Sequence, residues 1–360
     1  MKPKERDSVE KIKRIPNPEG RTGYIRLDKN EHLDSVSRSF LRSYKKMLTS
    51  EVISMYPEVC LIKKQVAGYA GVPSENIILS HGSDAAIKQV FDVFARKGAQ
   101  VVLLEPTYAM YRIYGEIAGC DIKWIRCNDD FEVSKKQLLE SINKNVCIVA
   151  IPNPNSPTGS EFSERFLLEV LKKCQKFGIL FLIDEAYYPF SRMTMMKYVV
   201  RESNLVITRT FSKAFGLGGC RAGFMAVSSE LIEIIQKARP MYEINALSAL
   251  AVKVCLKNLK EMHKYVRKVR EGRDYLNIQC KKIGLTSYPV NANFMNIRLP
   301  EGLDALKLQE FGRANGILFK GDRSAGCLYN CIRVTLAPKK YMIKFVALLK
   351  RFKEDTCGKR

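Results

Sequence analysis

Apolar runs of strand length alternate with amphipathic stretches along residues 46–239. Six runs are short and almost wholly apolar, a pattern typical of buried strands: Ile77–Leu79, Val101–Leu104, Val146–Ile151, Ile179–Ile183, Leu205–Ile207 and Phe224–Val227. The stretches between them have helical periodicity, as in the stripe of Leu167, Val170, Leu171 and Cys174. This alternation predicts an α/β fold, with a three-layer large domain around a mainly parallel sheet.

The pattern changes on either side of this region. Residues 1–45 are polar and basic and are interrupted by prolines and glycines, so they predict an N-terminal arm. Pro240 marks a break, and a helix-rich stretch leads to short strands at Phe294–Ile297 and Ile332–Thr335. At 360 residues the chain exceeds one compact core. We therefore expect residues 1–45 to form the arm and part of a small domain, 46–240 the large domain, and 241–360 a linker helix and a smaller α+β C-terminal domain.

The net charge of +23 raises the question of a polyanionic partner. The basic residues are spread along the chain and mixed with acids, so we predict a solvated basic surface and no nucleic acid partner. The chain has no apolar run of about twenty residues and no apolar signal core at its start, so we predict no membrane partner. Eleven scattered cysteines and three distant histidines predict no metal site and a cytoplasmic protein with free thiols.

Lys213 is the first candidate for chemistry. It follows the apolar run that ends at Ile207, and four glycines lie within the next ten residues. A deprotonated lysine amine can form a Schiff base with an aldehyde. The hydroxyls of Thr210 and Ser212, together with Arg221, indicate an anion nearby. A reactive lysine beside a phosphate site is typical of proteins that bind pyridoxal 5'-phosphate (PLP). The alternative interpretation of Lys213 is an ordinary surface lysine.

Asp184 ends the apolar run Ile179–Ile183, where ligands of doubly wound sheets bind. A PLP ring needs a carboxylate against its pyridine nitrogen, and Asp184 is the candidate, although it can equally be a helix N-cap. Tyr187, three residues on, can reach the phenolic oxygen of the ring.

Two further turns follow predicted strands. Gly82-Ser83-Asp84 begins a predicted helix, and backbone N–H groups at a helix start bind phosphate. Asp84 can instead be only the N-cap of that helix. Asn153-Pro-Asn-Ser-Pro-Thr-Gly159 is a stiff turn whose asparagines are rigidly aimed donors.

In this order the motifs Gly82-Ser-Asp-Ala, Pro106-Thr-Tyr, Asn153-Pro-Asn-Ser-Pro-Thr-Gly, Asp184-Glu-Ala-Tyr-Tyr and Ser212-Lys-Ala-Phe-Gly resemble the fold-type I PLP-dependent aminotransferases. This is the aspartate aminotransferase superfamily, and the histidinol-phosphate aminotransferase group is the most similar part of it. The resemblance runs from about Leu27 to Pro338. It implies a homodimer with shared active sites.

The resemblance also implies roles for single residues. Lys213 would carry the Schiff base, Asp184 would pair with the pyridinium nitrogen, and Tyr187 would donate to the ring oxygen. The other implied cofactor contacts are Ser83, Asp84, Tyr108 (stacked on the ring), Asn155, Thr210, Ser212, Arg221 and, from the partner subunit's copy, Tyr56. The implied substrate contacts are Arg333, Lys320, Arg323, Glu243 and Tyr242.

Three positions depart from the family pattern. The Asn-Pro-Tyr-Gly segment that should follow Glu31 is absent, which removes a substrate-binding tyrosine. Lys320 stands where the group has an arginine, so the charge remains but the bidentate fork is lost; Arg323 is close enough to compensate. Ser156 stands where an asparagine usually binds the ring oxygen, and we assign that role to Asn155.

The loop around Tyr242 lies where relatives hold a short segment near the substrate. Glu243 can bind a substrate hydroxyl or ammonium there, or it can be an ordinary residue of a helix start.

We therefore predict a PLP-dependent aminotransferase that moves an amino group from an amino acid, glutamate, to a small phosphorylated carbonyl compound. The alternatives are a decarboxylase of a phosphorylated amino acid, a carbon–sulfur lyase of the same fold, and a ligand-sensing regulator. The regulator is the weakest of them because the N-terminal segment is too short and too interrupted for a DNA-binding domain.

Overall fold

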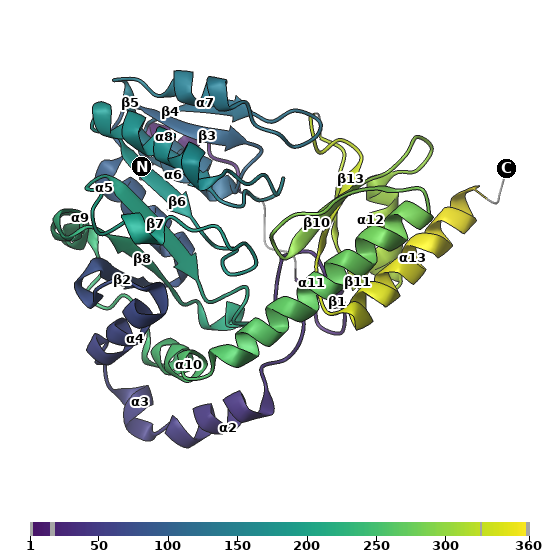
Figure 1. Ribbon diagram of the computed structural model, residues 1–360, viewed down its shortest axis with the longest axis horizontal. Coiled ribbons are helices and arrows are strands. Elements are labelled where there is room, and N and C mark those ends of the chain that lie inside the picture. Colours follow the sequence, from purple (N-terminus) through teal and green to yellow (C-terminus); the bar gives the residue numbers. More distant parts are fainter. Residues whose placement is uncertain (1–2, 15–18, 325, 358–360) are drawn as a thin grey trace.

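The computed structural model describes residues 3–14, 19–324 and 326–357 (Figure 1). Its largest sheet has the strand order β2-β8-β7-β6-β5-β3-β4. These strands are β2 (Ile77–Ser80), β3 (Gln100–Glu105), β4 (Asp121–Arg126), β5 (Val146–Pro152), β6 (Leu180–Asp184), β7 (Leu205–Thr210) and β8 (Gly223–Val227). Strand β8 runs antiparallel to both β2 and β7, and the other neighbours are parallel.

All six predicted strands of the large domain are present, and β4 is the one that the pattern missed. Its sequence alternates polar and apolar residues because it is the edge strand, with only Ile125 buried. The five residues of β6, in contrast, are all buried. Successive residues of β6 pack into two different cores, Leu182 into one and Ile183 into the other, as the period of two in a strand requires.

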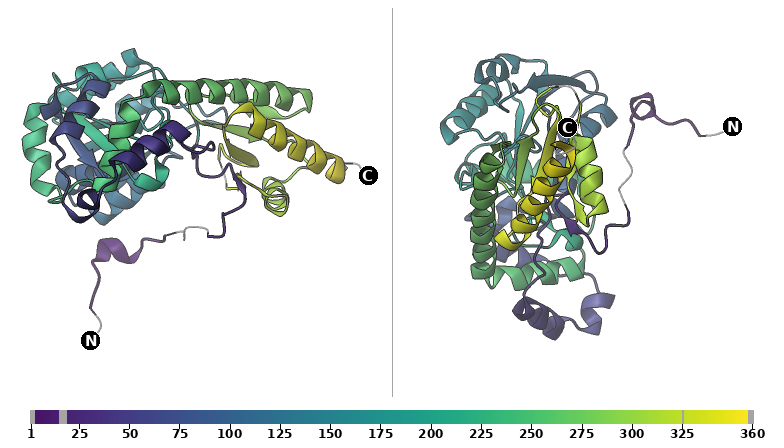
Figure 2. Two further views of the ribbon diagram at one scale, coloured as in Figure 1. Left: turned by 90° about the horizontal axis from the view of Figure 1, so that it is seen from below. Right: turned by 90° about the vertical axis from the view of Figure 1, so that its right-hand side faces the viewer.

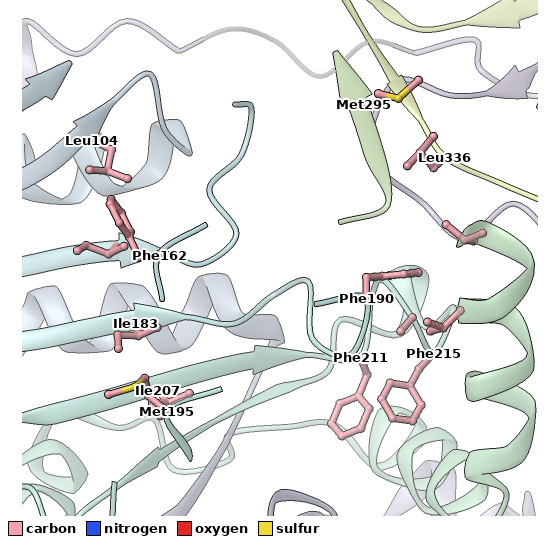
Figure 3. Packing of buried hydrophobic residues seen from close by; sticks show 14 of the residues in the cluster. Leu104, Phe162, Ile183, Phe190, Met195, Ile207, Phe211, Phe215, Met295 and Leu336 are labelled. Atoms are coloured by element: carbon pink, nitrogen blue, oxygen red, sulfur yellow. The ribbon is translucent and has the colours of Figure 1, made fainter. Parts of the chain in front are cut away.

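Helices cover both faces of this sheet, so the large domain has the predicted three layers. Helices α5 (Gly82–Phe94), α6 (Ala109–Ile117) and α9 (Ser229–Ile235) cover one face. Helices α4 (Cys60–Ala70), α7 (Lys135–Ser141) and α8 (Glu164–Lys176) pack on the other. Figure 3 shows part of the core that contains Ile183, where Ile183 and Ile207 lie on strands of the sheet and Phe211 and Phe215 lie in the segment after β7.

The small domain is built on the antiparallel sheet β12-β13-β10-β9. Its strands are β9 (Thr286–Tyr288), β10 (Phe294–Arg298), β12 (Lys320–Asp322) and β13 (Cys331–Thr335), and its helices are α11 (Leu259–Lys282), α12 (Ala305–Ala314) and α13 (Lys339–Cys357). The N-terminal strand β1 (Ile25–Arg26) pairs with β11 (Ile317–Leu318), which ties the start of the chain to this domain. Figure 2 shows α11 and α13 side by side along it.

The remaining segments connect these units. Helices α1 (Asp7–Glu10), α2 (Arg38–Met47) and α3 (Ser50–Ser54) precede the large domain, and α10 (Ala246–Leu256) follows it. Single 3₁₀ turns lie at Ser74–Asn76, Met196–Tyr198, Gly218–Cys220 and Gln236–Ala238. We propose that the domains divide as predicted, into residues 1–45, 46–240 and 241–360. The boundary at residue 45 falls within α2, and the boundary at residue 240 falls in irregular chain before α10. None of the described helices has the length and hydropathy to cross a membrane.

Candidate active site

The candidate residues gather at one edge of the large sheet. Asp184 is the last residue of β6, and Thr210 is the last residue of β7. The segments that follow β3, β5 and β2 carry the Pro106, Asn153 and Gly82 motifs. Because these five strands run in the same direction, all five motifs reach the same edge, where doubly wound sheets bind their ligands.

Asp184 is a buried carboxylate held by two hydroxyl donors. The Tyr111 hydroxyl donates to Oδ2 at 2.8 Å, and the Thr208 hydroxyl donates to Oδ1 at 2.9 Å. Burial raises the pKa of Asp184 from 3.8 to about 6, and the two hydrogen bonds counteract part of that rise. The side chain is therefore fixed in direction and has no ion pair with a cation among the described residues, which leaves it suited to a cationic ring nitrogen.

Lys213 lies in the loop after β7, with its Nζ donating to the Lys29 carbonyl at 3.0 Å. Burial, followed by the neighbouring charge of Arg333, lowers its pKa from 10.5 to about 8. At neutral pH the deprotonated fraction of the Lys213 amine is therefore about 300 times that of an exposed lysine. A neutral amine is the nucleophile that Schiff base formation needs.

An anion cradle lies beside this lysine, at the start of α5. Gly82 has φ +76°, and a Cβ there would meet the Arg221 guanidinium at 2.8 Å. A Cβ on Gly223 would lie 2.5 Å from the Ser83 backbone nitrogen. The two glycines thus let Arg221 and the first N–H groups of α5 approach one another, as a phosphate site at a helix start requires.

Two hydroxyls complete the cradle. The Thr210 hydroxyl donates to the Ser212 oxygen at 3.0 Å, and Arg221 donates to the same oxygen at 3.2 Å. Arg221 itself has φ 52°, a left-handed conformation that turns its side chain back toward Gly82. Four of the five predicted phosphate-site residues, Ser83, Thr210, Ser212 and Arg221, are therefore neighbours, and the fifth is Asp84.

Asp84 has a different environment from the predicted alternative of a helix cap. Its Oδ1 accepts hydrogen bonds from the hydroxyls of Tyr108 and Tyr114, each at 3.1 Å. The N-cap position of α5 is His81, which makes no side-chain cap. The bond to Asp84 restrains Tyr108, whose ring is 40% exposed and meets Tyr111 edge-on at 5.8 Å. Stacking of Tyr108 on the ring stays a prediction.

Tyr187 follows β6, and the turn with Asn155 and Ser156 follows the neighbouring strand β5. The buried Tyr187 hydroxyl accepts from Asn30 Nδ2 at 2.9 Å. Burial raises the pKa of Tyr187, and a hydrogen bond with the Ser156 side chain opposes that rise. The side-chain amide of the neighbouring Asn155 is already hydrogen-bonded: it donates to the Pro106 carbonyl at 2.9 Å and to the Thr158 hydroxyl at 2.8 Å. The Asn155 amide is thus engaged within its own turn, and its predicted contact with the ring oxygen stays a prediction.

Arg333 comes from β13 of the small domain and is half-buried. One guanidinium nitrogen donates to the Asp28 carbonyl at 3.1 Å, and Nε has no partner among the described residues. Burial lowers its pKa. Its cross-strand neighbours are Lys320 on β12 and Asn296 on β10, and residues directly opposite share one face of a sheet. Lys320 is exposed, so this face offers one half-buried and one solvated cation.

Two of the predicted substrate contacts are engaged elsewhere. Arg323 forms an ion pair with Asp304 and donates to the Tyr329 hydroxyl at 3.0 Å, in a separate surface cavity of the small domain. Glu243 pairs with Arg239 at 2.9 Å. Both side chains thus have partners other than Arg333 and Lys320, so compensation by Arg323 for the missing arginine is not supported by this placement.

Tyr56 and Tyr242 stack on each other, with ring centroids 3.9 Å apart and planes 3° apart. Both lie outside the cofactor cradle of their own chain, and Tyr56 is 73% exposed. Its predicted contact across a dimer stays a prediction.

Comparison with known proteins places this geometry in a family. The family model for aminotransferase class I and II matches residues 22–347. The chain belongs to this family. The enzyme is therefore a PLP-dependent aminotransferase.

The relatives include histidinol-phosphate aminotransferases. The enzyme of that name from Ruminiclostridium cellulolyticum is 33% identical over 326 residues, 88% of this chain and 89% of the relative. The crystal structure of the Sinorhizobium meliloti enzyme, solved with pyridoxal 5'-phosphate, has a TM-score of 0.82 at 22% identity and covers 92% of this chain and 91% of its own. The fold is shared as well by L-threonine-O-3-phosphate decarboxylase from Porphyromonas gingivalis, with a TM-score of 0.76 at 19% identity, covering 92% of this chain and 99% of its own.

PLP fits the donor set of this aminotransferase. The cradle of α5 and Arg221 suits its phosphate, and Asp184 suits its ring nitrogen. The unpaired Arg333 Nε suits a carboxylate on the substrate. The described residues contain no group of three or more His, Cys, Asp or Glu side chains that could hold a metal ion.

The sequence reasoning missed three of the aminotransferase's supporting residues. Tyr111 and Thr208 hold Asp184, and Asn30 holds Tyr187. Asn30 carried a signal, because it belongs to the N-terminal signature that includes Glu31. Tyr111 carried none, since its position in α6 reads as an ordinary apolar helix face.

Proposed function

We propose that this aminotransferase takes the amino group of glutamate and transfers it to a small phosphorylated carbonyl compound. The observation that carries the proposal is the buried Nε of the half-buried Arg333, which has no partner among the described residues and lies opposite Lys320 in the sheet. An unpaired buried donor costs free energy that an anionic ligand recovers, and a charged hydrogen bond contributes about 1.5–3 kcal/mol. A dicarboxylate donor and a phosphorylated acceptor both supply such an anion.

The chain's own residues divide the work of transfer. PLP, when bound, supplies an electron sink for the substrate's amino carbon. Lys213 Nζ, with its pKa near 8, takes the proton from the substrate's α-carbon and returns it later as a general acid. Asp184 keeps the ring nitrogen cationic, and its hydroxyl partners prevent it from rotating away. Arg333 orients the substrate carboxylate so that the α-carbon lies near Nζ.

The phosphorylated acceptor is supported by charge and by the relatives. Lys320 keeps a cation at the position where the related group has an arginine, and the net charge of +23 favours anionic substrates. Relatives of similar length carry the name histidinol-phosphate aminotransferase. The missing tyrosine after Glu31 and the lysine at 320 indicate a phosphate held with different geometry, so the acceptor can differ from that of the relatives.

We propose Ser156 as the partner of Tyr187 at the ring oxygen. Its side chain already meets the Tyr187 hydroxyl, whereas the amide of Asn155 is occupied by Pro106 and Thr158. A Ser156→Ala variant should change the visible absorbance of the bound cofactor, and Asn155→Ala should chiefly lower the stability of the turn.

The deciding experiment is the visible absorption spectrum of the PLP-loaded protein before and after L-glutamate. Conversion to the spectrum of the amino form of the cofactor supports a glutamate-dependent aminotransferase. A decarboxylase would instead be assigned if glutamate and other amino donors leave the spectrum unchanged and phosphorylated amino acids release carbon dioxide. Arg323→Gln is a matched control for substitutions of Arg333, because Arg323 is paired outside the site and its loss should leave the response to glutamate unchanged.

We propose further that the enzyme is a homodimer with shared sites. Large apolar side chains are exposed together before α4 and after α9, among them Ile53 (68%), Met55 (65%), Tyr56 (73%) and Met241 (82%). Exposed apolar groups of this number on neighbouring segments are typical of an interface between proteins. A second copy of the chain is the proposed occupant, and light scattering of the purified protein measures it.

Subunit mixing tests whether the sites are shared. The Lys213→Ala and Tyr56→Phe variants each have two defective sites if Tyr56 serves the partner's cofactor. A mixed dimer then contains one site with both native residues, so mixing should recover activity above that of either variant. Recovery would be absent if Tyr56 serves its own chain.

We also propose that the protein works in the cytoplasm. The ten cysteines whose side chains the structure describes are free thiols, including the partly exposed Cys127 and the exposed Cys60. Such thiols persist in a reducing compartment. Fractionation of cells that express the full chain tests the location.

A further inference from the structure

We propose that Cys127 and Cys327 form a reversible disulfide that links the large domain to the small domain under oxidising conditions. The two sulfur atoms lie 3.0 Å apart although the residues are 200 positions apart in sequence. This separation is shorter than an ordinary contact between two sulfur atoms, so a small side-chain rotation brings them to bonding distance. The inference does not depend on which acceptor the enzyme uses.

Each cysteine belongs to a different domain. Cys127 directly follows β4, the edge strand of the large sheet, and its N–H donates to the Glu105 carbonyl at 3.0 Å. Cys327 lies in the loop between β12 and β13 of the small domain. A bond between them therefore connects the two sheets directly, at a point far along the chain from the linker that already joins them.

The surroundings hold the two thiols together. The Arg298 guanidinium donates both to the Asp129 carbonyl at 2.6 Å and to the Cys327 carbonyl at 2.9 Å. One side chain of β10 thus ties the segment after Cys127 to the loop of Cys327. Phe131 and Tyr288 pack edge-on at 4.8 Å beside the pair. The contact between the sulfurs is therefore part of a packed junction, with apolar and hydrogen-bonded support from both domains.

The chemistry of the pair favours oxidation at Cys127. Cys127 is partly exposed and Cys327 is buried, so a small oxidant meets Cys127 first. The two sulfur atoms lie within hydrogen-bonding distance, and the interaction with the Cys327 side chain lowers the pKa of Cys127. A thiolate is the form that reacts with peroxide.

Hydrogen peroxide is the oxidant that we name. The Cys127 thiolate attacks one peroxide oxygen, which breaks the O–O bond and gives a sulfenic acid and hydroxide. The Cys327 sulfur then attacks the Cys127 sulfur, the S–O bond breaks, and the hydroxyl leaves as water. Two thiol hydrogens and one peroxide thus become one disulfide and two waters, with two electrons passed from sulfur to oxygen. A dithiol reverses the step by thiol–disulfide exchange.

The link acts on the substrate-binding side of the enzyme. The loop of Cys327 joins β12, which begins at Lys320, to β13, which carries Arg333. The disulfide would therefore hold the two cationic side chains of Lys320 and Arg333 at a fixed position relative to Lys213 and the large domain. Because it closes a span of 200 residues, it should also restrict the unfolded chain and stabilise the folded protein.

The test is mild oxidation of the PLP-loaded protein with hydrogen peroxide, followed by peptide mapping without reduction. We expect a linked pair of peptides that contain Cys127 and Cys327, with the loss of two hydrogen atoms. The thermal unfolding midpoint should rise by roughly 5 °C in the oxidised protein and return with dithiothreitol. Cys60→Ser, which removes an exposed thiol away from the junction, should respond like the wild type.

Two further variants keep the inference refutable. Cys127→Ser should lose both the linked peptides and the thermal shift. Cys331→Ser should keep both, since the Cys331 S–H is directed to the Tyr329 and Cys327 carbonyls and not to Cys127. The proposal is overturned if Cys127 is oxidised only to sulfinic acid, if Cys327 links to Cys331, or if the midpoint rises equally in Cys127→Ser.

Discussion

Substitution of Lys213 by methionine should stabilise the cofactor-free protein, because the site holds this lysine at a cost. Burial lowers the pKa of Lys213 from 10.5 to about 8. The unfolded chain therefore binds the proton more tightly than the folded chain, and folding costs free energy below pH 8. The cost decreases as the pH rises from about 8 to 10.5 and is absent above that range. Methionine keeps much of the length of the side chain and has no charge.

The magnitude follows from the two pKa values. At about 1.4 kcal/mol for each pH unit of difference, the cost at pH 7 is about 3 kcal/mol. At about pH 9.5 it falls to about 1.4 kcal/mol, so the advantage of Lys213→Met should shrink by about 2 kcal/mol between these conditions. Changes in packing add to the advantage at both pH values alike, and therefore cancel in the difference.

Urea unfolding of the cofactor-free proteins at both pH values measures this difference. Lys344→Met is the matched control, because Lys344 is an exposed residue of α13 and its substitution should give no pH-dependent change. An advantage of Lys213→Met that is the same at both pH values would refute the argument that the site depresses the pKa of Lys213. The variant should also lack transaminase turnover at either pH.

Three other substitutions test the supporting residues. Tyr111→Phe removes a hydrogen bond from the Asp184 carboxylate and raises the pKa of Asp184 above about 6. PLP should therefore bind more weakly, and as the pH is lowered it should be released at a higher pH than from the wild type; a titration of cofactor fluorescence against pH measures this. Glu185→Gln leaves the buried charge of Arg209 unpaired and should cost about 3–5 kcal/mol in urea unfolding; a loss below about 1 kcal/mol would contradict the assignment of that ion pair as buried. Arg333→Lys loses the bidentate fork and should raise the KM for the donor by about tenfold or more, with a smaller effect on kcat, in steady-state kinetics.

The large domain was accessible from sequence because its signals are local. A buried strand such as β6 is apolar throughout, and the residue that ends it, Asp184, must reach the ligand edge of a parallel sheet. The motif around Lys213 follows β7 by the same rule. Strand β4 was missed for a local reason as well, since an edge strand needs polar residues and loses its apolar signal.

Choices between neighbouring residues were beyond that reasoning. Asn155 and Ser156 are adjacent in a stiff turn, and their composition does not say which side chain turns inward. The structure occupies Asn155 with Pro106, Thr107 and Thr158, which leaves Ser156 beside Tyr187. Arg323 likewise lies near Lys320 in sequence, but an ion pair with Asp304 directs it elsewhere.

Sequence alone therefore determined the class of the fold and the order of the motifs, because each depends on a periodicity or a spacing within one element. Only the tertiary structure decided the contacts that tune them. Asn30 reaches Tyr187 across 157 residues, Tyr111 reaches Asp184 across 73, and Cys127 meets Cys327 across 200. Such contacts arise where separate elements pack against one another, and no local pattern of polar and apolar residues encodes which distant partner a side chain will meet.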